Sequence, residues 1–213
     1  MLDFLNTTCA NFDASVFRAM NRLAVSAGGF FTPFFKAITF VGEWGAIVFI
    51  TAFILMLFKK TRKLGVCMFG AVACGALITN ITIKDIVARK RPFELSEEFA
   101  GFLKFIGGKA EMGYSFPSGH VTAVAGSMTG LFIICNKKFS WLGVFAVLLM
   151  GLSRVYLIAH YATDVIAGIV VGMISGVISY FITKLIYHLL NKYQDKKFFN
   201  FVLNFDILEA FKR

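Results

Sequence analysis

The chain has 213 residues, of which 58% are hydrophobic and 16% are charged, and its 22 lysines and arginines against 12 aspartates and glutamates give a net charge of +10. Soluble globular proteins average about 45–50% apolar and about 25% charged residues. The composition therefore excludes a disordered chain, a nucleic-acid-binding arm and a collagen-like repeat. It predicts a polytopic membrane protein that is all-α, because each segment in lipid must satisfy its own backbone hydrogen bonds, with membrane lipids and no nucleic acid as partners.

Residues 1–36 are predicted to form an N-terminal amphipathic segment at the membrane interface. From Phe12 to Ala24, apolar side chains recur at helical spacing, with Arg18 and other polar residues on the opposite face. Asp13 is placed to cap this helix. A partner-binding helix is the alternative. The first residues lack a basic region followed by a compact apolar stretch, so we expect no cleavable signal peptide.

Residues 37–190 are predicted to form the transmembrane domain, a bundle of five to six helices. A crossing needs about 20 mostly apolar residues. Five stretches qualify, at residues 37–58, 64–83, 117–135, 139–159 and 165–183. Glu43 interrupts the first of them, either as a buried partner for a cation or as an acid at the membrane interface.

Small residues recur every fourth position in two of these stretches. Gly168, Gly172 and Gly176 lie in the last stretch, and Gly126 and Gly130 lie in the third. In lipid, such residues let helix backbones approach closely. We therefore expect these glycines to pack the bundle, and not to form a phosphate-binding loop.

Residues 191–213 are predicted to form a cytoplasmic amphipathic tail. Asn204, Asp206 and Glu209 are expected to turn away from an apolar stripe, which suits a helix that lies on a membrane surface, with partner binding as the alternative. The stripe consists of Phe198, Phe201, Val202, Phe205 and Leu208.

The alternation of five spans brings four of their ends to one side of the membrane, where three polar clusters lie, at residues 84–91, 118–120 and 154–164. Ionisable groups at such depth are costly and mark functional sites. The other side is rich in basic residues, which the positive-inside rule assigns to the cytoplasm. We therefore expect a multi-pass protein of the cytoplasmic membrane whose clusters face the outside or periplasm. The 12 basic residues are Lys59, Lys60, Arg62, Lys63, Lys137, Lys138, Lys184, Lys192, Lys196, Lys197, Lys212 and Arg213.

The first cluster contains two cations seven residues apart. Two helical turns place Lys84 and Arg91 on one face, and Pro92 is expected to end the helix. Arginine offers a planar bidentate fork and lysine a point charge, so the pair suits a multiply charged oxyanion. Arg89 and Lys90 are expected to point to the surface or to lipid headgroups.

The second cluster begins a helix. Pro117 fits the first helical turn, so the amides of Ser118, Gly119 and His120 are expected to point outward with the positive end of the helix dipole. Gly119 lets the backbone approach closely, and His120 can give or take a proton near neutral pH. A helix cap accounts for every residue except the histidine.

The third cluster contains a histidine and an aspartate four residues apart. His160 and Asp164 can meet on one helical face, where a carboxylate on one imidazole nitrogen leaves the other free as a nucleophile. Arg154 supplies a third cation. A structural histidine–aspartate hydrogen bond is the alternative.

These residues resemble the three-part signature of the type 2 phosphatidic acid phosphatase superfamily. That family includes lipid phosphate phosphatases, bacterial phosphatidylglycerophosphate and undecaprenyl-diphosphate phosphatases, and soluble vanadium haloperoxidases. The matching residues are Lys84, Arg91, Pro92, Pro117, Ser118, Gly119, His120, Ser153, Arg154, His160 and Asp164. The resemblance implies an acid phosphatase/vanadium haloperoxidase-like helical core.

The resemblance also implies a role for each residue of the site. His160 is then the nucleophile that forms a phosphohistidine, Asp164 orients it, and His120 protonates the leaving group and later activates water. The remaining residues of the phosphate cradle are Lys84, Arg91, Ser118, Gly119 and Arg154. Neither a metal nor another cofactor is implied.

The expected activity is hydrolysis of a lipid phosphate or diphosphate. Undecaprenyl diphosphate is the favoured substrate, and phosphatidylglycerophosphate or phosphatidate follows. Two alternatives remain open. The same phosphohistidine chemistry would serve a lipid phosphotransferase, and the cations alone would serve a non-catalytic protein that binds anions or lipids.

Overall fold

The computed structural model describes residues 1–41, 45–135 and 141–210, and every regular element in these ranges is helical, which confirms the all-helical prediction. The elements are α1 (Leu2–Thr7), α2 (Ala10–Ser26), α3 (Thr32–Val41), α4 (Ala46–Leu57), α5 (Arg62–Ala76), a π-helix (Leu77–Ile83), α6 (Lys84–Val87), α7 (Pro92–Leu95), α8 (Glu97–Phe105), α9 (Gly119–Ile134), α10 (Trp141–Tyr156), α11 (Ala162–Lys192), α12 (Lys197–Asn204) and α13 (Ile207–Ala210).

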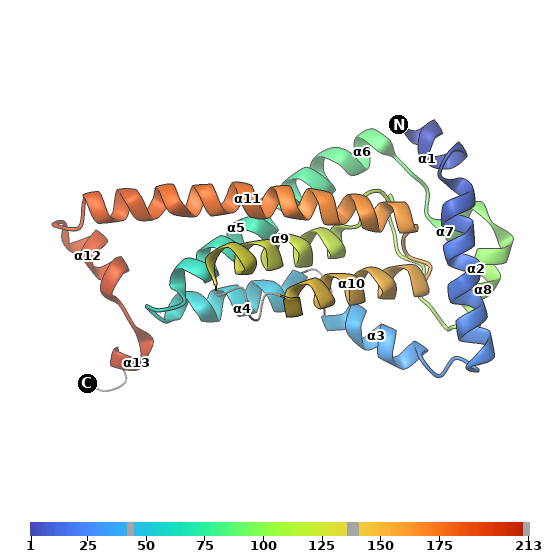
Figure 1. Ribbon diagram of the computed structural model, residues 1–213, viewed down its shortest axis with the longest axis horizontal. Coiled ribbons are helices and arrows are strands. Elements are labelled where there is room, and N and C mark those ends of the chain that lie inside the picture. The colour runs from blue at the N-terminus through green and yellow to red at the C-terminus, as the bar shows by residue number, and fades with distance from the viewer. Residues whose placement is uncertain (42–44, 136–140, 211–213) are drawn as a thin grey trace.

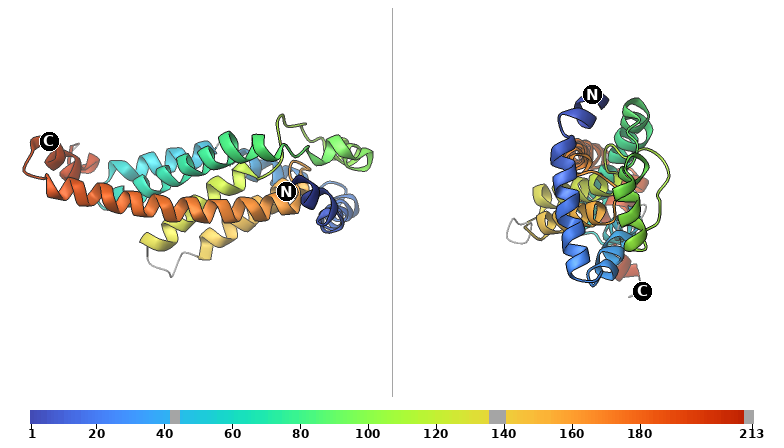
Figure 2. Two further views of the ribbon diagram at one scale, coloured as in Figure 1. Left: turned by 90° about the horizontal axis from the view of Figure 1, so that it is seen from above. Right: turned by 90° about the vertical axis from the view of Figure 1, so that its right-hand side faces the viewer.

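The long helix α11 organises the bundle. It packs along α9 and α5, while α4 packs on α5 and α10 packs on α9. Figure 1 shows the bundle as an elongated body with α12 and α13 at one end and α1, α2, α7 and α8 at the other. The end-on view in Figure 2 shows α2 and α8 lying across the ends of the bundle helices.

The recurring glycines lie where helices cross, as predicted. A β-carbon on Gly172 would lie 2.6 Å from the β-carbon of Ala125 on α9, and one on Gly176 would lie 2.6 Å from the carbonyl oxygen of Gly126. Real β-carbons do not approach backbone atoms this closely. The contact of α11 with α9 therefore depends on the absence of side chains at these positions.

Two segments are long and apolar enough to cross a membrane, Arg62–Leu95 and Ala162–Lys192. The apolar helices α4, α9 and α10 have 12, 16 and 16 residues. At a rise of about 1.5 Å per residue they are about 18–24 Å long, shorter than the roughly 30 Å of hydrocarbon. The five-to-six count therefore stays a prediction.

The stretch 37–58 is not one helix. Helix α3 ends at Val41 and α4 begins at Ala46, after Gly45, whose positive φ of 66° favours glycine. Glu43 lies outside the described residues.

The N-terminal helix α2 packs onto the bundle through the apolar face predicted from the sequence. Phe17 is 1% exposed and lies against the rings of Phe99 and Tyr161, and Ala24 is fully buried. Asp13, in contrast, does not cap α2, whose first turn follows Cys9 without a side-chain cap. Its carboxylate reaches another helix, as described below. The predicted domain boundary at residue 36 falls within α3.

The C-terminal tail folds back onto the loop between α4 and α5. The Lys59 amide donates to Asp206 Oδ2 at 3.0 Å, and Lys59 Nζ donates to Asn204 Oδ1 at 2.9 Å. Arg62 is buried and its guanidinium donates to carbonyl groups of the tail. Arg62 is therefore a structural cation, and not one of the solvated charges that set orientation. Phe198 and Phe201 of the predicted stripe remain exposed.

A glycine comparison tests the packing of the bundle. Gly172→Ala should lower the free energy of unfolding by about 1–3 kcal/mol, because the new methyl group overlaps Ala125 and the backbone of α9. Gly101→Ala in α8 is the matched control, because no atom lies within 4 Å of its β-carbon. The control should be neutral or stabilising by up to about 1 kcal/mol. Denaturation in detergent micelles measures both, and equal effects would contradict the packing argument.

Candidate active site

The three polar clusters of the sequence meet at the end of the bundle that α1 and α2 cover. A cleft of about 810 Å³ opens between them. Its polar lining includes Lys84, Arg91, Glu111, His120 and His160. Its apolar lining comes from the bundle helices and includes Phe49, Val72, Ala76 and Ala123. The cleft thus joins a charged end to an apolar flank.

Lys84 and Arg91 both line the cleft, although not on one helix face as predicted. Helix α6 ends at Val87, and Ala88 follows in the left-handed conformation with φ 50°. Pro92 does not end this helix but begins α7, where its missing amide hydrogen is not needed. Arg91 is held in place by three carbonyl groups. Its guanidinium donates to the carbonyl oxygens of Ala159 at 2.7 Å, Gly113 at 3.0 Å and Met112 at 3.3 Å.

Helix α9 begins at Gly119, two residues later than the sequence suggested. Pro117 precedes the helix, and Ser118 is its N-cap. The Ser118 amide donates to the carbonyl of Asp164 at 3.1 Å. The prediction that this amide is free to bind an anion is therefore wrong. Gly119 and His120 lie in the first turn, whose amides have no partners within the helix. A β-carbon at Gly119 would lie 3.0 Å from Asn80 Oδ1, which explains the glycine.

His160 lies in the loop between α10 and α11, before the helix that contains Asp164. The prediction that the two residues share a helical face is therefore wrong, although they lie close together. His160 Nδ1 is 2.7 Å from the carbonyl oxygen of Ser115 and 3.6 Å from Asp164 Oδ2. A carbonyl oxygen only accepts, so Nδ1 carries the proton and the lone pair lies on Nε2. Ser115 thus fixes the tautomer, with the Asp164 carboxylate beside it.

His160 is buried among cations. Burial, and then Arg154 and Arg91, lower the pKa of His160 well below its ordinary value, with Glu111 acting in the opposite direction. The imidazole is therefore neutral at neutral pH. A neutral imidazole with a free Nε2 lone pair is the form that attacks an electrophile.

Glu111 is a site residue that the sequence reasoning missed. It lies in the loop between α8 and α9 and pairs with Arg91 at 3.0 Å and with Arg154. The two guanidinium groups hold the pKa of its carboxyl at about 2, against the effect of burial. Glu111 therefore stays ionised at every physiological pH. No local pattern marks it, since its partners are distant in the sequence.

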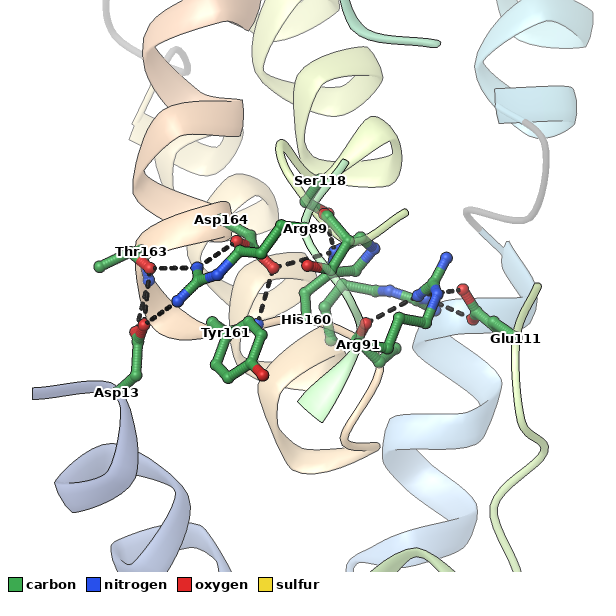
Figure 3. A network of polar contacts seen from close by, with 12 residues as sticks. Asp13, Arg89, Arg91, Glu111, Ser118, His160, Tyr161, Thr163 and Asp164 are labelled. Atoms are coloured by element: carbon green, nitrogen blue, oxygen red, sulfur yellow. Dashed lines mark hydrogen bonds and ion pairs between the residues drawn. The ribbon is translucent and has the colours of Figure 1, made fainter. Parts of the chain in front are cut away.

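Arg89 corrects another prediction, because it does not face the surface. Its side chain is 1% exposed and lies between two buried carboxylates, at 2.8 Å from Asp13 Oδ2 and 2.6 Å from Asp164 Oδ1. Figure 3 shows Arg89 between Asp13 on one side and Asp164 and His160 on the other. Lys90, as predicted, is exposed.

Three buried polar atoms of the predicted cradle have no hydrogen-bond partner within residues 1–41, 45–135 and 141–210. They are Ser118 Oγ, His120 Nε2 and Arg154 Nε. Each can donate a hydrogen bond, and unpaired buried polar groups are costly in a folded protein. Donors of this kind suit an oxyanion such as phosphate.

The charges agree with such a ligand. Lys84, Arg91 and Arg154 contribute three positive charges, and Glu111 and Asp85, which both line the cleft, contribute two negative charges, so a net positive charge remains near the neutral His160. A phosphate monoester carries nearly two negative charges at pH 7. In the described part of the chain no group of three or more His, Cys, Asp or Glu residues is arranged to hold a metal ion.

The pairing of Glu111 with both arginines predicts competition with anions. Glu111→Gln should tighten binding of inorganic phosphate about tenfold or more, because a carboxylate no longer shares Arg91 and Arg154, while Arg91 keeps its carbonyl partners. Calorimetric titration in detergent measures the affinity. Glu98→Gln is the matched control, because Glu98 forms only an exposed ion pair with Arg18. Unchanged or weaker binding by Glu111→Gln would contradict the expected competition.

The chain is similar to a known protein family. The model of the PAP2 superfamily matches residues 61–188. An undecaprenyl-diphosphatase of Sulfolobus acidocaldarius is 30% identical over 116 residues, which cover 54% of this chain and 53% of the relative. A lipid A 4'-phosphatase of Porphyromonas gingivalis is 32% identical over 133 residues, which cover 60% of this chain and 56% of the relative. The chain thus spans about half the length of these curated relatives.

The fold has a counterpart among solved structures. A transmembrane PAP2-type phosphatidylglycerolphosphate phosphatase from Bacillus subtilis superposes with a TM-score of 0.62 at 20% identity. The match covers 85% of this chain and 87% of that one. This likeness shows that the two chains share a helical fold. Because the family model covers more than half of its residues, the chain belongs to the PAP2 superfamily.

Proposed function

We propose that this protein is a metal-independent lipid phosphatase that hydrolyses a lipid phosphate or diphosphate through a phosphohistidine. One observation carries the proposal. The cleft brings together His120, whose buried Nε2 has no partner in the described chain, and the neutral His160, whose proton is held on Nδ1, and buried Ser118 Oγ and Arg154 Nε also lack a partner there. A protein that only bound phosphate would need the donors but not the oriented nucleophile.

In the first step, the lone pair of His160 Nε2 forms a bond to phosphorus, and the bond from phosphorus to the lipid oxygen breaks. Burial and then Arg154 lower the pKa of His120 to about 3, and the negative charge of the substrate phosphate acts in the opposite direction, so His120 is protonated when substrate binds. The leaving oxygen takes this proton from His120 Nε2, which has no other partner in the described chain. Arg91, Arg154 and Lys84 stabilise the charge that builds up on the phosphoryl oxygens. The carbonyl of Ser115 and the carboxylate of Asp164 stabilise the proton that stays on Nδ1.

In the second step, water attacks phosphorus and the bond from phosphorus to His160 breaks. His120, now neutral, accepts a proton from the attacking water. Inorganic phosphate leaves, and both histidines return to their initial states. The two roles of His120 follow from microscopic reversibility.

The apolar flank of the cleft is the proposed route for the lipid tail. Phe49 belongs to α4, Val72 and Ala76 to α5, and Ala123 to α9, all helices of the bundle. A tail that enters between these helices stays in hydrocarbon while its headgroup reaches the cations. This arrangement favours a lipid substrate over a soluble phosphate ester.

Undecaprenyl diphosphate is our first choice of substrate. One relative is named for hydrolysis of this lipid. Phosphatidylglycerophosphate and phosphatidate follow, the first supported by the name of the solved neighbour. Lipid A phosphates are named for the other relative. All four substrates carry a phosphoryl group on a lipid, which is what the cleft is built to bind.

Phosphate release in detergent micelles that contain EDTA tests the proposal. With a panel of these four lipid phosphates, the wild-type protein should release phosphate and His160→Ala should not, because it lacks the nucleophile. His120→Ala should lower kcat by about 10²–10⁴ for loss of the proton donor. His188→Ala is the matched control, because this third histidine is exposed near the far end of α11.

Two outcomes would contradict the proposal. Equal rates for wild type and His160→Ala would exclude the proposed nucleophile, and loss of wild-type activity in EDTA would exclude metal-free hydrolysis. Transfer of phosphate to an added lipid alcohol in preference to water would identify a phosphotransferase instead.

We also propose that the five apolar segments cross the cytoplasmic membrane, with the cleft on the outer face. The support is the basic composition of the opposite end, where Lys59, Lys60, Lys192, Lys196 and Lys197 lie near the C-terminal tail. A reporter fused after residue 213 should then read as cytoplasmic. An external reading would reverse the orientation and place the cleft inside the cell.

A further inference from the structure

Arg89 lies outside the cleft, yet it is the most completely bonded side chain near the site. Its guanidinium has five N–H donors. They contact Asn6 Oδ1 at 3.2 Å, Thr163 Oγ1 at 2.8 Å, Asp164 Oδ1 at 2.6 Å, the Leu5 carbonyl at 3.3 Å and Asp13 Oδ2 at 2.8 Å. The guanidinium carbon also lies 3.7 Å from the centre of the Tyr161 ring. Five bonds and a stacked ring fix its position.

Asp13 connects the N-terminal helix α2 to this arginine and to α11. Its Oδ2 accepts from Arg89 and from Thr163 Oγ1, and its Oδ1 accepts from the Thr163 amide at 2.9 Å. Thr163 lies in the first turn of α11, one residue before Asp164. Asp13 therefore caps the helix that carries Asp164, and it does so from a distant part of the chain.

The net charge of the cluster formed by Asp13, Arg89 and Asp164 acts on the imidazole of His160. Asp13 and Asp164 contribute two negative charges and Arg89 one positive charge, so the cluster carries −1. Without the charge of Asp13, Arg89 would neutralise Asp164. With it, Asp164 keeps a net negative charge 3.6 Å from His160 Nδ1. An imidazole that forms a bond to phosphorus becomes positively charged, and a nearby negative charge stabilises that state.

We propose that Asp13 is a positioning residue that balances the charge of Arg89, so that the carboxylate of Asp164 stabilises the positive charge that develops on His160 during phosphoryl transfer. The inference rests on the proposed function. It assigns α2 a role in the chemical step in addition to its packing against the bundle. Asp13 never touches the substrate and acts only through Arg89 and Asp164.

Asp13→Asn tests this role, because it keeps the shape of the side chain and removes its charge. The expected result is a fall in kcat of about tenfold or more at an unchanged affinity for inorganic phosphate. Phosphate is bound by Arg91 and Arg154, which Asp13 does not contact. Calorimetric titration gives both the affinity and the fraction of molecules with an intact site, so partial unfolding is detected separately.

A second variant removes both charges. Asp13→Asn combined with Arg89→Gln removes the positive charge that Asp13→Asn leaves unbalanced beside Asp164, so kcat should recover about fivefold or more above Asp13→Asn. A purely structural network predicts the opposite, because two disruptions of one buried network do not restore activity. Glu98→Gln is the control for docking of α2, since its exposed ion pair with Arg18 joins α2 to α8, and it should leave kcat unchanged.

The outcomes separate this inference from the proposed function. If wild-type protein releases no phosphate, or His160→Ala is equally active, the proposed function fails first. If wild-type activity depends on His160 but Asp13→Asn keeps its kcat, only the role of Asp13 is overturned. Weaker phosphate binding by Asp13→Asn, or a double variant no more active than Asp13→Asn, also overturns it. If the double variant cannot be purified, the kcat and phosphate affinity of Asp13→Asn decide.

Discussion

The fold at one end of the bundle depends on the burial of three guanidinium groups. Arg89, Arg91 and Arg154 are at most 3% exposed, and an arginine this deep is tolerated only with bonded and charged partners. Their partners come from α1, α2, α3 and α11, from the loop after α8 and from the loop before α11. The bonds to the arginines therefore connect these loops and the N-terminal helices to the end of the bundle. Under the proposed function the cations divide, since Arg91 and Arg154 pair with Glu111 at the site while Arg89 pairs with Asp164 next to His160.

The residues that gather at the cleft were predicted more completely than the local backbone structure that positions them. The three clusters are recognisable because residue spacing and hydropathy are local properties, and the helices of the bundle bring them to one end. Asp13 and Glu111 were not predicted to lie at the site. Their partners Arg89 and Arg154 are 76 and 43 residues away in the sequence, and no periodicity links such positions. The role of the Ser115 carbonyl was equally hidden, since every residue has a carbonyl group. The prediction that Lys84 and Arg91 share one helix face was wrong for a local reason. The left-handed Ala88 ends α6, and Pro92 begins a separate helix, α7.

In the helical bundle, too, some features were predicted from the sequence and others were not. Apolar composition predicted the helices, and the spaced glycines predicted where α9 and α11 touch. Composition alone could not show that the first stretch divides at Gly45 or that three helices are shorter than the hydrocarbon layer. Helix α4 begins after Gly45 and α9 begins at Gly119, and both glycines line the cleft, so these two helices start where the cleft lies.

Glu111 is the most exposed of the acids that pair with the buried arginines. The arginines are fixed, because Arg91 is held by three carbonyl groups and Arg154 is fully buried, whereas the Glu111 side chain is one-third exposed. Its loop contains Gly107 and Gly113, both with positive φ, so the backbone there is not constrained by a helix or by β-carbons. A carboxylate and a phosphoryl group bind arginine by the same bidentate geometry. Under the proposed function, a phosphoryl group and the Glu111 carboxylate compete for the same two guanidinium groups, and the exposed carboxylate is the one of these partners that can turn toward solvent.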